Sequence, residues 1–181
     1  MGQVGCNWRY RIGVNPNMGI IDLILQFFTS LKPSTPEPKE EAPVTPEPIP
    51  ADEVTLDDWI TSSGKYMARA SSPELTDEVK ANAELLLGRI NRLLKDIEEV
   101  RSVNSGFRTS ASNKKAGGAK KSRHMTGEAI DLDDDDGSLD ALIDANPELL
   151  EKFDLYRESP TATPGWCHLQ TAKASKRTFL P

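Results

Sequence analysis

The sequence favours a small α+β domain, and three features of residues 54–181 carry that prediction. A long apolar stripe at helical spacing follows Thr76. Short stretches with strand-like alternation surround the two histidines of the chain, His124 and His168. Two shorter helical patterns lie between these histidines. Helices and short strands in this arrangement are consistent with an α+β domain, but they do not fix its topology.

Composition is compatible with one globular domain and a tail. The chain has 181 residues, of which 37% are hydrophobic and 28% are charged. A general nucleic-acid binder would show a basic surface, so the net charge of -6 argues against that class. The two cysteines, Cys6 and Cys167, lie in different parts of the chain and are not expected to form a disulfide. Cysteine usage therefore does not indicate a cellular compartment.

Proline-rich sequence divides the chain into three parts. Residues 33–53 contain prolines too often for a helix or a sheet, together with many charges and few large apolar groups. This composition predicts an extended linker, which is either a tether for the domain or a spacer without a role. Residues 1–32 form an N-terminal tail, and residues 54–181 form the folded domain.

The tail contains one apolar run, Met18 to Phe28, whose spacing predicts a short amphipathic helix. It is well short of the ~20 residues that cross a bilayer. Asp22 and Gln26 interrupt it and no clear cleavage site follows, so a secretory signal peptide is not expected. Residues 18–31 are a candidate for peripheral contact with a membrane or a virion. The simpler alternative is a tail without structure.

The main core helix of the domain is expected to begin after Thr76. This threonine suits the N-cap, and Asp77 and Glu78 follow it in the first turn, where the helix dipole favours negative charge. The apolar positions of the helix form one continuous stripe: Val79, Ala83, Leu86, Leu87, Ile90, Leu93, Leu94 and Ile97.

Strands are expected near Val103, at 129–132 and at 166–170. The polar segment 110–121, with paired glycines and four lysines, is expected to be a loop. Its lysines are either solvated or hold an anionic polymer near the site. The acidic run 133–136 lacks the alternating ligands and the distal Glu of an EF-hand loop, so we expect a turn there.

Two histidines and one aspartate suggest a metal site. His124 and Asp131 are seven residues apart in the phrase SRHMTGEAID, and His168 lies in GWCHLQ. Two imidazoles and one carboxylate can form an open, catalytic zinc site. The spacing alone is too loose to be diagnostic, so two ordinary histidines satisfied within the protein stay an alternative. Cys167 is not expected to be a ligand, because neighbouring side chains in a strand point to opposite faces.

Three motifs resemble those of the zinc D-Ala-D-Ala carboxypeptidases and the related L-alanyl-D-glutamate endopeptidases. Residues 122–131 match S-x-H-x-x-G-x-A-x-D, residues 105–108 resemble S-G-aromatic-R, and residues 166–168 read W-x-H, in the family's order. The group includes VanY-like enzymes and phage endolysins, and it shares its fold with the hedgehog signalling domain. The resemblance covers about residues 54–181. It implies an α+β zinc peptidase domain in which a small antiparallel sheet carries the zinc site and helices pack against it.

The resemblance also implies roles for individual residues. His124, Asp131 and His168 would bind Zn²⁺, which would activate a water for attack on a peptide bond of the peptidoglycan stem. Arg108 would hold a substrate carboxylate or the developing oxyanion, against the alternative of a surface salt bridge. Ser122 would support the loop or contact substrate.

The general base is the point where this sequence departs from the family. Many members carry Glu or Asp three residues before the second zinc histidine, but this chain has Gly165 there. Glu158 is the natural substitute, provided that it reaches the activated water within ~3 Å or through one further water. If Glu158 is only a surface residue, the domain is a catalytically weak or inactive zinc-containing module that binds cell-wall peptides or a protein partner.

The leading hypothesis is a zinc-dependent peptidoglycan peptidase that cuts a stem-peptide amide bond in cell-wall lysis or remodelling. It is either a D,D-carboxypeptidase or an endopeptidase, and the sequence does not distinguish a phage from a bacterial origin. The expected partners are peptidoglycan stem peptides, with no nucleic acid, and the expected state is a monomer. The expected place of action is the cell wall, reached from the periplasmic or extracellular side or delivered by a phage.

Overall fold

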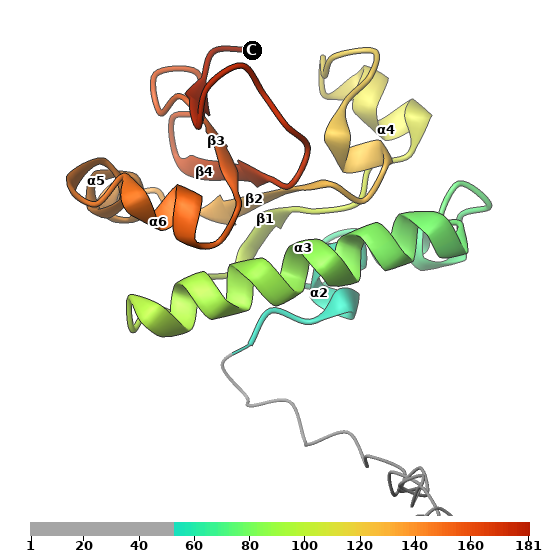
Figure 1. The fold of residues 1–181 in the computed structure, drawn as a ribbon. Coiled ribbons are helices and arrows are strands. Elements are labelled where there is room, and N and C mark those ends of the chain that lie inside the picture. Colours follow the sequence, from blue (N-terminus) through green and yellow to red (C-terminus); the bar gives the residue numbers. More distant parts are fainter. Residues whose placement is uncertain (1–52) are drawn as a thin grey trace, which may run out of the picture. The chain divides into compact units, whose positions relative to one another are not determined.

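The computed structural model describes residues 53–181, in which a long helix lies along one face of a five-stranded sheet (Figure 1). The predictions for residues 1–52, namely the tail helix and nearly all of the linker, lie outside these residues. No helix within residues 53–181 combines the length and the apolar character needed to cross a membrane. The helices and strands in chain order are α2 (Leu56–Thr61), the 3-10 helix η1 (Met67–Ser71), α3 (Asp77–Asp96), β1 (Val103–Ser105), α4 (Ser110–Lys115), the 3-10 helix η2 (Arg123–Met125), β2 (Ala129–Asp133), α5 (Ser138–Ala145), α6 (Glu148–Lys152), β3 (Tyr156–Glu158), β4 (Trp166–Gln170) and β5 (Thr178–Phe179).

The sheet has the strand order β1-β2-β4-β3-β5. Its first three pairings are antiparallel, and only β3 and β5 run parallel. The predicted α+β class is therefore confirmed, while the sheet is mixed rather than purely antiparallel. The reason is local: the chain reverses direction after β4, so β5 runs the same way as β3, which is itself antiparallel to β4.

The predicted core helix is confirmed as α3. Its N-cap is Thr76, whose side chain accepts a hydrogen bond from the backbone N–H of Val79 at 3.3 Å. Seven of the eight residues in the predicted stripe are buried, and Ile97, directly after the helix, packs against the same core. The stripe faces apolar side chains from the sheet and from α2, α5 and α6, so one hydrophobic core joins all these elements.

Side chains of β2 and β4 alternate between this core and the opposite face of the sheet. Ile130, Leu132, Cys167 and Leu169 belong to the core, and Leu132 is paired with Cys167. The residues between them, Asp131 and His168, must therefore face the other side. Cys167 points away from the candidate ligands, as expected.

The segment 110–121 differs from its prediction as a loop, because its first half forms the helix α4. Thr109 caps this helix: its hydroxyl oxygen accepts a hydrogen bond from the N–H of Ser112 at 3.1 Å. The buried Asn113 then donates its side-chain N–H to the carbonyl of Ala119 at 2.9 Å, which closes the following turn. A polar helix of six residues leaves no apolar periodicity, so the sequence pattern does not reveal it.

In the acidic run 133–136, Asp133 ends β2 and the expected turn follows it, but Asp134 is buried. Its carboxylate accepts hydrogen bonds from the N–H groups of Leu139 and Asp140, at 2.8 and 3.0 Å, at the start of α5. Arg101 donates a further hydrogen bond to it at 3.2 Å. The Asp134 carboxylate therefore satisfies two backbone N–H groups in the first turn of α5 and is paired with Arg101.

Two motif glycines lie where the backbone passes very close to the helices beneath the sheet. A Cβ at Gly106 would lie 2.0 Å from the carbonyl oxygen of Trp59 in α2. A Cβ at Gly127 would lie 2.2 Å from the carbonyl oxygen of Val79 in α3, and Gly127 also has a φ of +83°. Only glycine fits either position without movement of the backbone.

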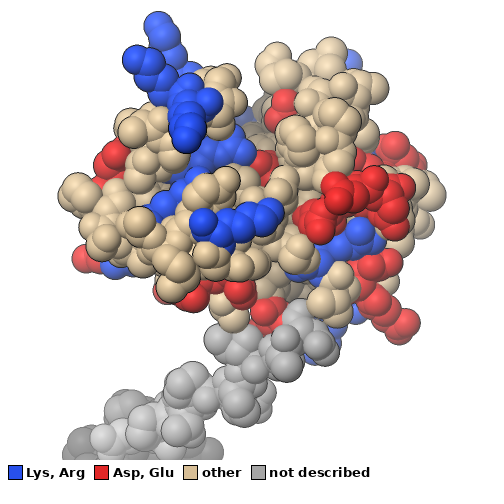
Figure 2. Space-filling model, turned by 180° about the vertical axis from the view of Figure 1, so that it is seen from behind, with Lys and Arg blue, Asp and Glu red and all other residues tan. Residues whose placement is uncertain are grey.

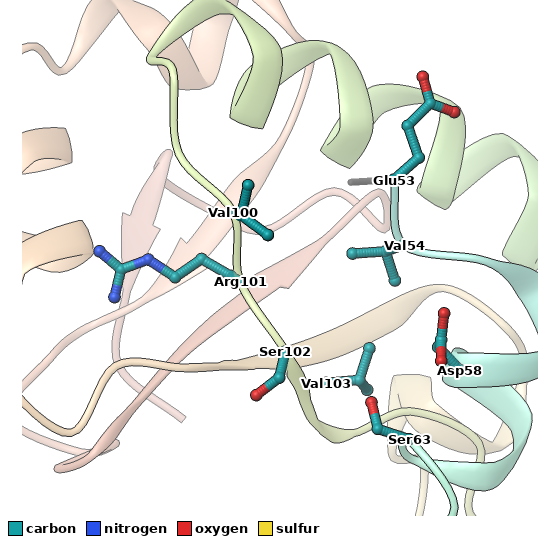
Figure 3. A pocket seen from close by; sticks show the side chains of 8 residues that line it. All are labelled: Glu53, Val54, Asp58, Ser63, Val100, Arg101, Ser102 and Val103. Carbon is teal, nitrogen blue, oxygen red and sulfur yellow. The ribbon is translucent and has the colours of Figure 1, made fainter. Parts of the chain in front are cut away.

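A hollow of about 210 Å³ lies between the start of α2 and the segment that leads into β1 (Figure 3). Its lining includes Val54, Asp58 and Val100. None of the site residues predicted from the sequence lines it.

The Gly127→Ala substitution is expected to lower the free energy of unfolding by about 2–4 kcal/mol, because it adds a side chain at positive φ and forces overlap with α3. The measurement is urea-induced unfolding of metal-free protein, so that metal binding does not contribute. Gly88→Ala is the matched control: it lies exposed within α3 with nothing within 4 Å of the added Cβ. It should leave stability unchanged or raise it by up to about 1 kcal/mol. Equal stability of the two variants would contradict the close-contact argument.

Candidate metal centre

Three segments bring His124, Asp131 and His168 together on the face of the sheet opposite α3. His124 lies in η2, Asp131 in β2 and His168 in β4. One potential ligand atom from each residue lies within 4.8 Å of the others, and all three side chains are buried. Asp131 and His168 are direct cross-strand partners, which places their side chains on the same face. His168 Nδ1 lies 2.7 Å from Asp131 Oδ1, and His124 Nε2 lies 3.3 Å from the same oxygen.

The second nitrogen of each imidazole is held by an acceptor, which fixes the ring. His124 Nδ1 lies 2.8 Å from the carbonyl oxygen of Gly106, which can only accept a hydrogen bond. His168 Nε2 lies 3.4 Å from Gln170 Oε1, while the side-chain N–H of Gln170 donates to the carbonyl of Ala172 at 2.6 Å. These partners leave His124 Nε2 and His168 Nδ1 facing Asp131. Such outer hydrogen bonds are typical of metal-binding histidines.

Arg108 completes the surroundings of Asp131. Its guanidinium donates a hydrogen bond to Asp131 Oδ2 at 2.6 Å and another to the hydroxyl oxygen of Ser105 at 2.9 Å. This ion pair is not one between exposed surface groups, because the side chain of Asp131 is only 3% exposed. Arg108 leaves Oδ1 of the carboxylate free to face the two imidazoles.

Protonation of the three groups follows from burial and from their mutual contacts. Burial by itself would raise the pKa of Asp131, but His124 and His168 hold that pKa well below its usual range. Burial lowers the pKa of His124, against the opposing effect of Asp131. Burial also acts to lower the pKa of His168, but the hydrogen bond and charge of Asp131 outweigh it and raise that pKa. The proton between Asp131 and His168 therefore resides on the imidazole, and a bound metal cation would replace it.

All six site residues predicted from the sequence line one cleft of about 500 Å³. They are Arg108, Ser122, His124, Asp131, Glu158 and His168. Basic side chains gather on the lobe that carries α4, at the upper left of Figure 2, and acidic side chains gather at its right. Lys121 and Arg123 bring part of this positive charge to the cleft wall.

Glu158 lies beside His168, and Gly165 does not. In the antiparallel pair β3 and β4, Arg157 lies opposite Leu169. The next residue of β3, Glu158, therefore lies opposite the preceding residue of β4, His168. The negative charge of Glu158 contributes to the raised pKa of His168, after the larger effects of burial and Asp131. Gly165 has a φ of +92° in the turn before β4 and carries no acid. Of the two positions, only Glu158 offers a carboxylate to the cleft.

Three further residues contribute to the site, although the sequence motifs assign them no role. Ser105 orients Arg108, and Gln170 faces His168. Gln170 could have been found, because it lies two residues after His168 in a predicted strand and so shares its face. Trp59 in α2 accepts the N–H of Phe107 on its carbonyl at 2.9 Å and donates its indole N–H to the carbonyl of Ala129 at 2.9 Å. No local signal in the sequence marks that role.

A family model described as Peptidase M15 matches residues 64–149. Over these residues the match places the chain among the M15 peptidases. The matched range contains the motifs at 105–108 and 122–131, and it ends before Glu158 and His168. M15 peptidases are typically zinc-dependent, and the His-Asp-His group of this M15 chain has the donor set of a catalytic zinc site. A comparison with curated proteins gives no match.

Gln170→Ala is expected to weaken zinc binding about 10–100-fold, because it frees the His168 ring to rotate. His168→Ala should weaken it further, because it removes a ligand. Affinity can be measured by competition with a chromophoric chelator. Cys167→Ala is the control on the same strand: its side chain lies in the core, so zinc affinity should stay close to that of the unaltered protein. An unchanged affinity in Gln170→Ala would show that this hydrogen bond does not support the site.

Proposed function

We propose that this protein is a zinc-dependent peptidase that hydrolyses an amide bond in the stem peptide of peptidoglycan. One observation carries the proposal: the three ligand-type residues, a free carboxylate and a guanidinium all line one cleft in a member of the M15 family. We further propose that it acts on the cell wall as a monomer, since a single chain supplies all six site residues.

The residues present fit zinc. Two imidazoles and one carboxylate, each oriented by an outer hydrogen bond, are the protein ligands of an open zinc site. Zinc in such a site lowers the pKa of a bound water to about 7 and polarises a carbonyl oxygen. Carboxylate and imidazole donors with three protein ligands suit this role better than a structural site, which closes all four positions with protein groups.

Glu158 is proposed as the general base. Its carboxylate, in the cleft beside His168, would accept a proton from the attacking water and pass it to the amine that leaves. The strand pairing of Glu158 with Phe179 of β5 holds its backbone from the side away from β4. A base on a paired strand keeps its position better than one on a free loop. This placement favours an active enzyme over a module that only binds.

Arg108 is proposed to stabilise negative charge on the substrate. Its Nε and one terminal nitrogen are engaged by Ser105 and Asp131, so the guanidinium is fixed in orientation before substrate arrives. Its remaining N–H groups can donate to the oxyanion that develops at the attacked carbonyl or to a carboxylate nearby. Ser122, on the same cleft wall, is proposed to contact the peptide.

The class of bond is tested on purified sacculi with zinc-loaded protein. Release of new amino groups or of D-alanine is expected, and the released fragment distinguishes a D,D-carboxypeptidase from an endopeptidase. A strong chelator should abolish the release, and added zinc should restore it. If protein with one zinc per chain releases nothing from sacculi, the proposed function is wrong.

Glu158→Gln tests the general base separately. We expect kcat to fall about 10²–10⁴-fold, because an amide cannot accept the proton, while zinc content stays at one per chain. Glu148→Gln, an exposed position in α6, is the matched control and should keep full activity. Unchanged turnover in Glu158→Gln would remove Glu158 from this role.

A further inference from the structure

We propose that Arg69 binds a carboxylate of the peptide substrate in a second cleft beside the metal centre. This inference rests on the proposed function and adds a specificity-determining residue to it. Arg69 lies in η1, outside the three motifs that mark the site.

The second cleft adjoins the first one beside Asp131. It also measures about 500 Å³, and Arg108, Asp131 and Trp166 line both clefts. Of the three candidate ligands, Asp131 lines both clefts, so a peptide that passes Asp131 has room on both sides of it. The second cleft is bounded by η1 and by α4, through Arg69 and Lys115.

Arg69 is held in place before any ligand arrives. One terminal nitrogen donates to the carbonyl oxygen of Phe107 at 2.6 Å and to the hydroxyl of Ser62 at 3.3 Å. Its guanidinium lies 3.8 Å above the centre of the Tyr66 ring. Phe107 directly precedes Arg108, so Arg69 is anchored to the backbone of the motif itself. A guanidinium fixed in this way loses little freedom when it binds an anion.

The charge of Arg69 is not neutralised within the described part of the chain. Arg108 has Asp131 as its partner, but no carboxylate of residues 53–181 lies within ion-pair distance of Arg69. Partial burial lowers the pKa of Arg69; Tyr66 opposes this shift, and the charge of Arg108 adds to it. An anion between the two guanidinium groups would relieve this repulsion.

The lining of the second cleft as a whole favours an anionic ligand. Three cationic side chains line it, those of Arg69, Arg108 and Lys115, and Asp131 is the one acidic residue among the described residues that line it. Asp131 is already paired with Arg108. Peptidoglycan stem peptides carry free carboxylates at D-isoglutamate and at the C-terminus. A planar guanidinium matches a carboxylate through paired hydrogen bonds, which a neutral amide cannot form.

The test compares substrates that differ only in one carboxylate. Two pairs of stem peptides are used, one with D-isoglutamate against D-isoglutamine and one with a free against an amidated C-terminus. Zinc-loaded wild type should prefer the free acid in at least one pair. Arg69→Gln should reduce that preference about tenfold or more, mainly through KM, since a charge-assisted hydrogen bond is lost. Arg69→Lys should keep part of it, because the charge remains and the fork is lost.

The amide peptides control for damage to the fold, because a purely structural Arg69 would lower the rates for acid and amide equally. Arg92→Gln is the matched surface control: Arg92 is exposed on α3, where its Nε donates to the carbonyl of Gly88. An equal effect of Arg69→Gln on both members of each pair, or no effect, would overturn the proposal. If wild type cleaves none of the peptides, the proposed function fails. Calorimetric affinities of the same peptide pairs for wild type and Arg69→Gln then decide the role of Arg69.

Discussion

The site depends on one buried carboxylate, that of Asp131. A carboxylate with so little exposure is costly unless charged or hydrogen-bonding groups surround it. His124 and His168 approach one oxygen, and Arg108 binds the other. These three partners come from η2, from β4 and from the loop after β1, so the carboxylate holds together segments far apart in the chain. This arrangement also gathers one carboxylate oxygen and two imidazole nitrogens at one point. A divalent cation can bind these atoms once the proton that Asp131 and His168 share is released.

The scaffold beneath this carboxylate is a set of close backbone contacts. Trp59 is fully buried, and its carbonyl and indole N–H bind the backbone on either side of the site, at Phe107 and at Ala129. Gly106 passes directly over the Trp59 carbonyl, and its own carbonyl then accepts from His124. Gly127 passes over α3 in the same manner. The glycines of the motifs thus serve packing, and the close contact at Gly106 positions the imidazole of His124.

Much of the fold and site could be predicted because the signals are local. The stripe of α3 and the alternation in β2 and β4 lie within single segments, and the ligands lie at fixed places in short motifs. The prediction for 110–121 was wrong because α4 is formed by a cap and polar side chains, which leave no apolar period. Contacts between segments that are distant in the sequence could not be predicted from local patterns either. The pairing of Asp131 with His168, the anchor at Trp59 and the place of Arg69 beside Arg108 exist only in the folded chain.

The position of the acid in the cleft follows from the geometry of the sheet. In many relatives the acid precedes the second zinc histidine by three residues, which in this chain is the turn before β4. Gly165 occupies that turn with positive φ, and a Cβ there would already lie 3.3 Å from Asp135. A charged side chain at this position would be strained and would lie close to another carboxylate. Glu158 reaches the same cleft from β3, the strand next to His168. Because β3 is paired on both sides, by β4 and by β5, moving the acid to this strand gives it a firmer support than the turn could provide.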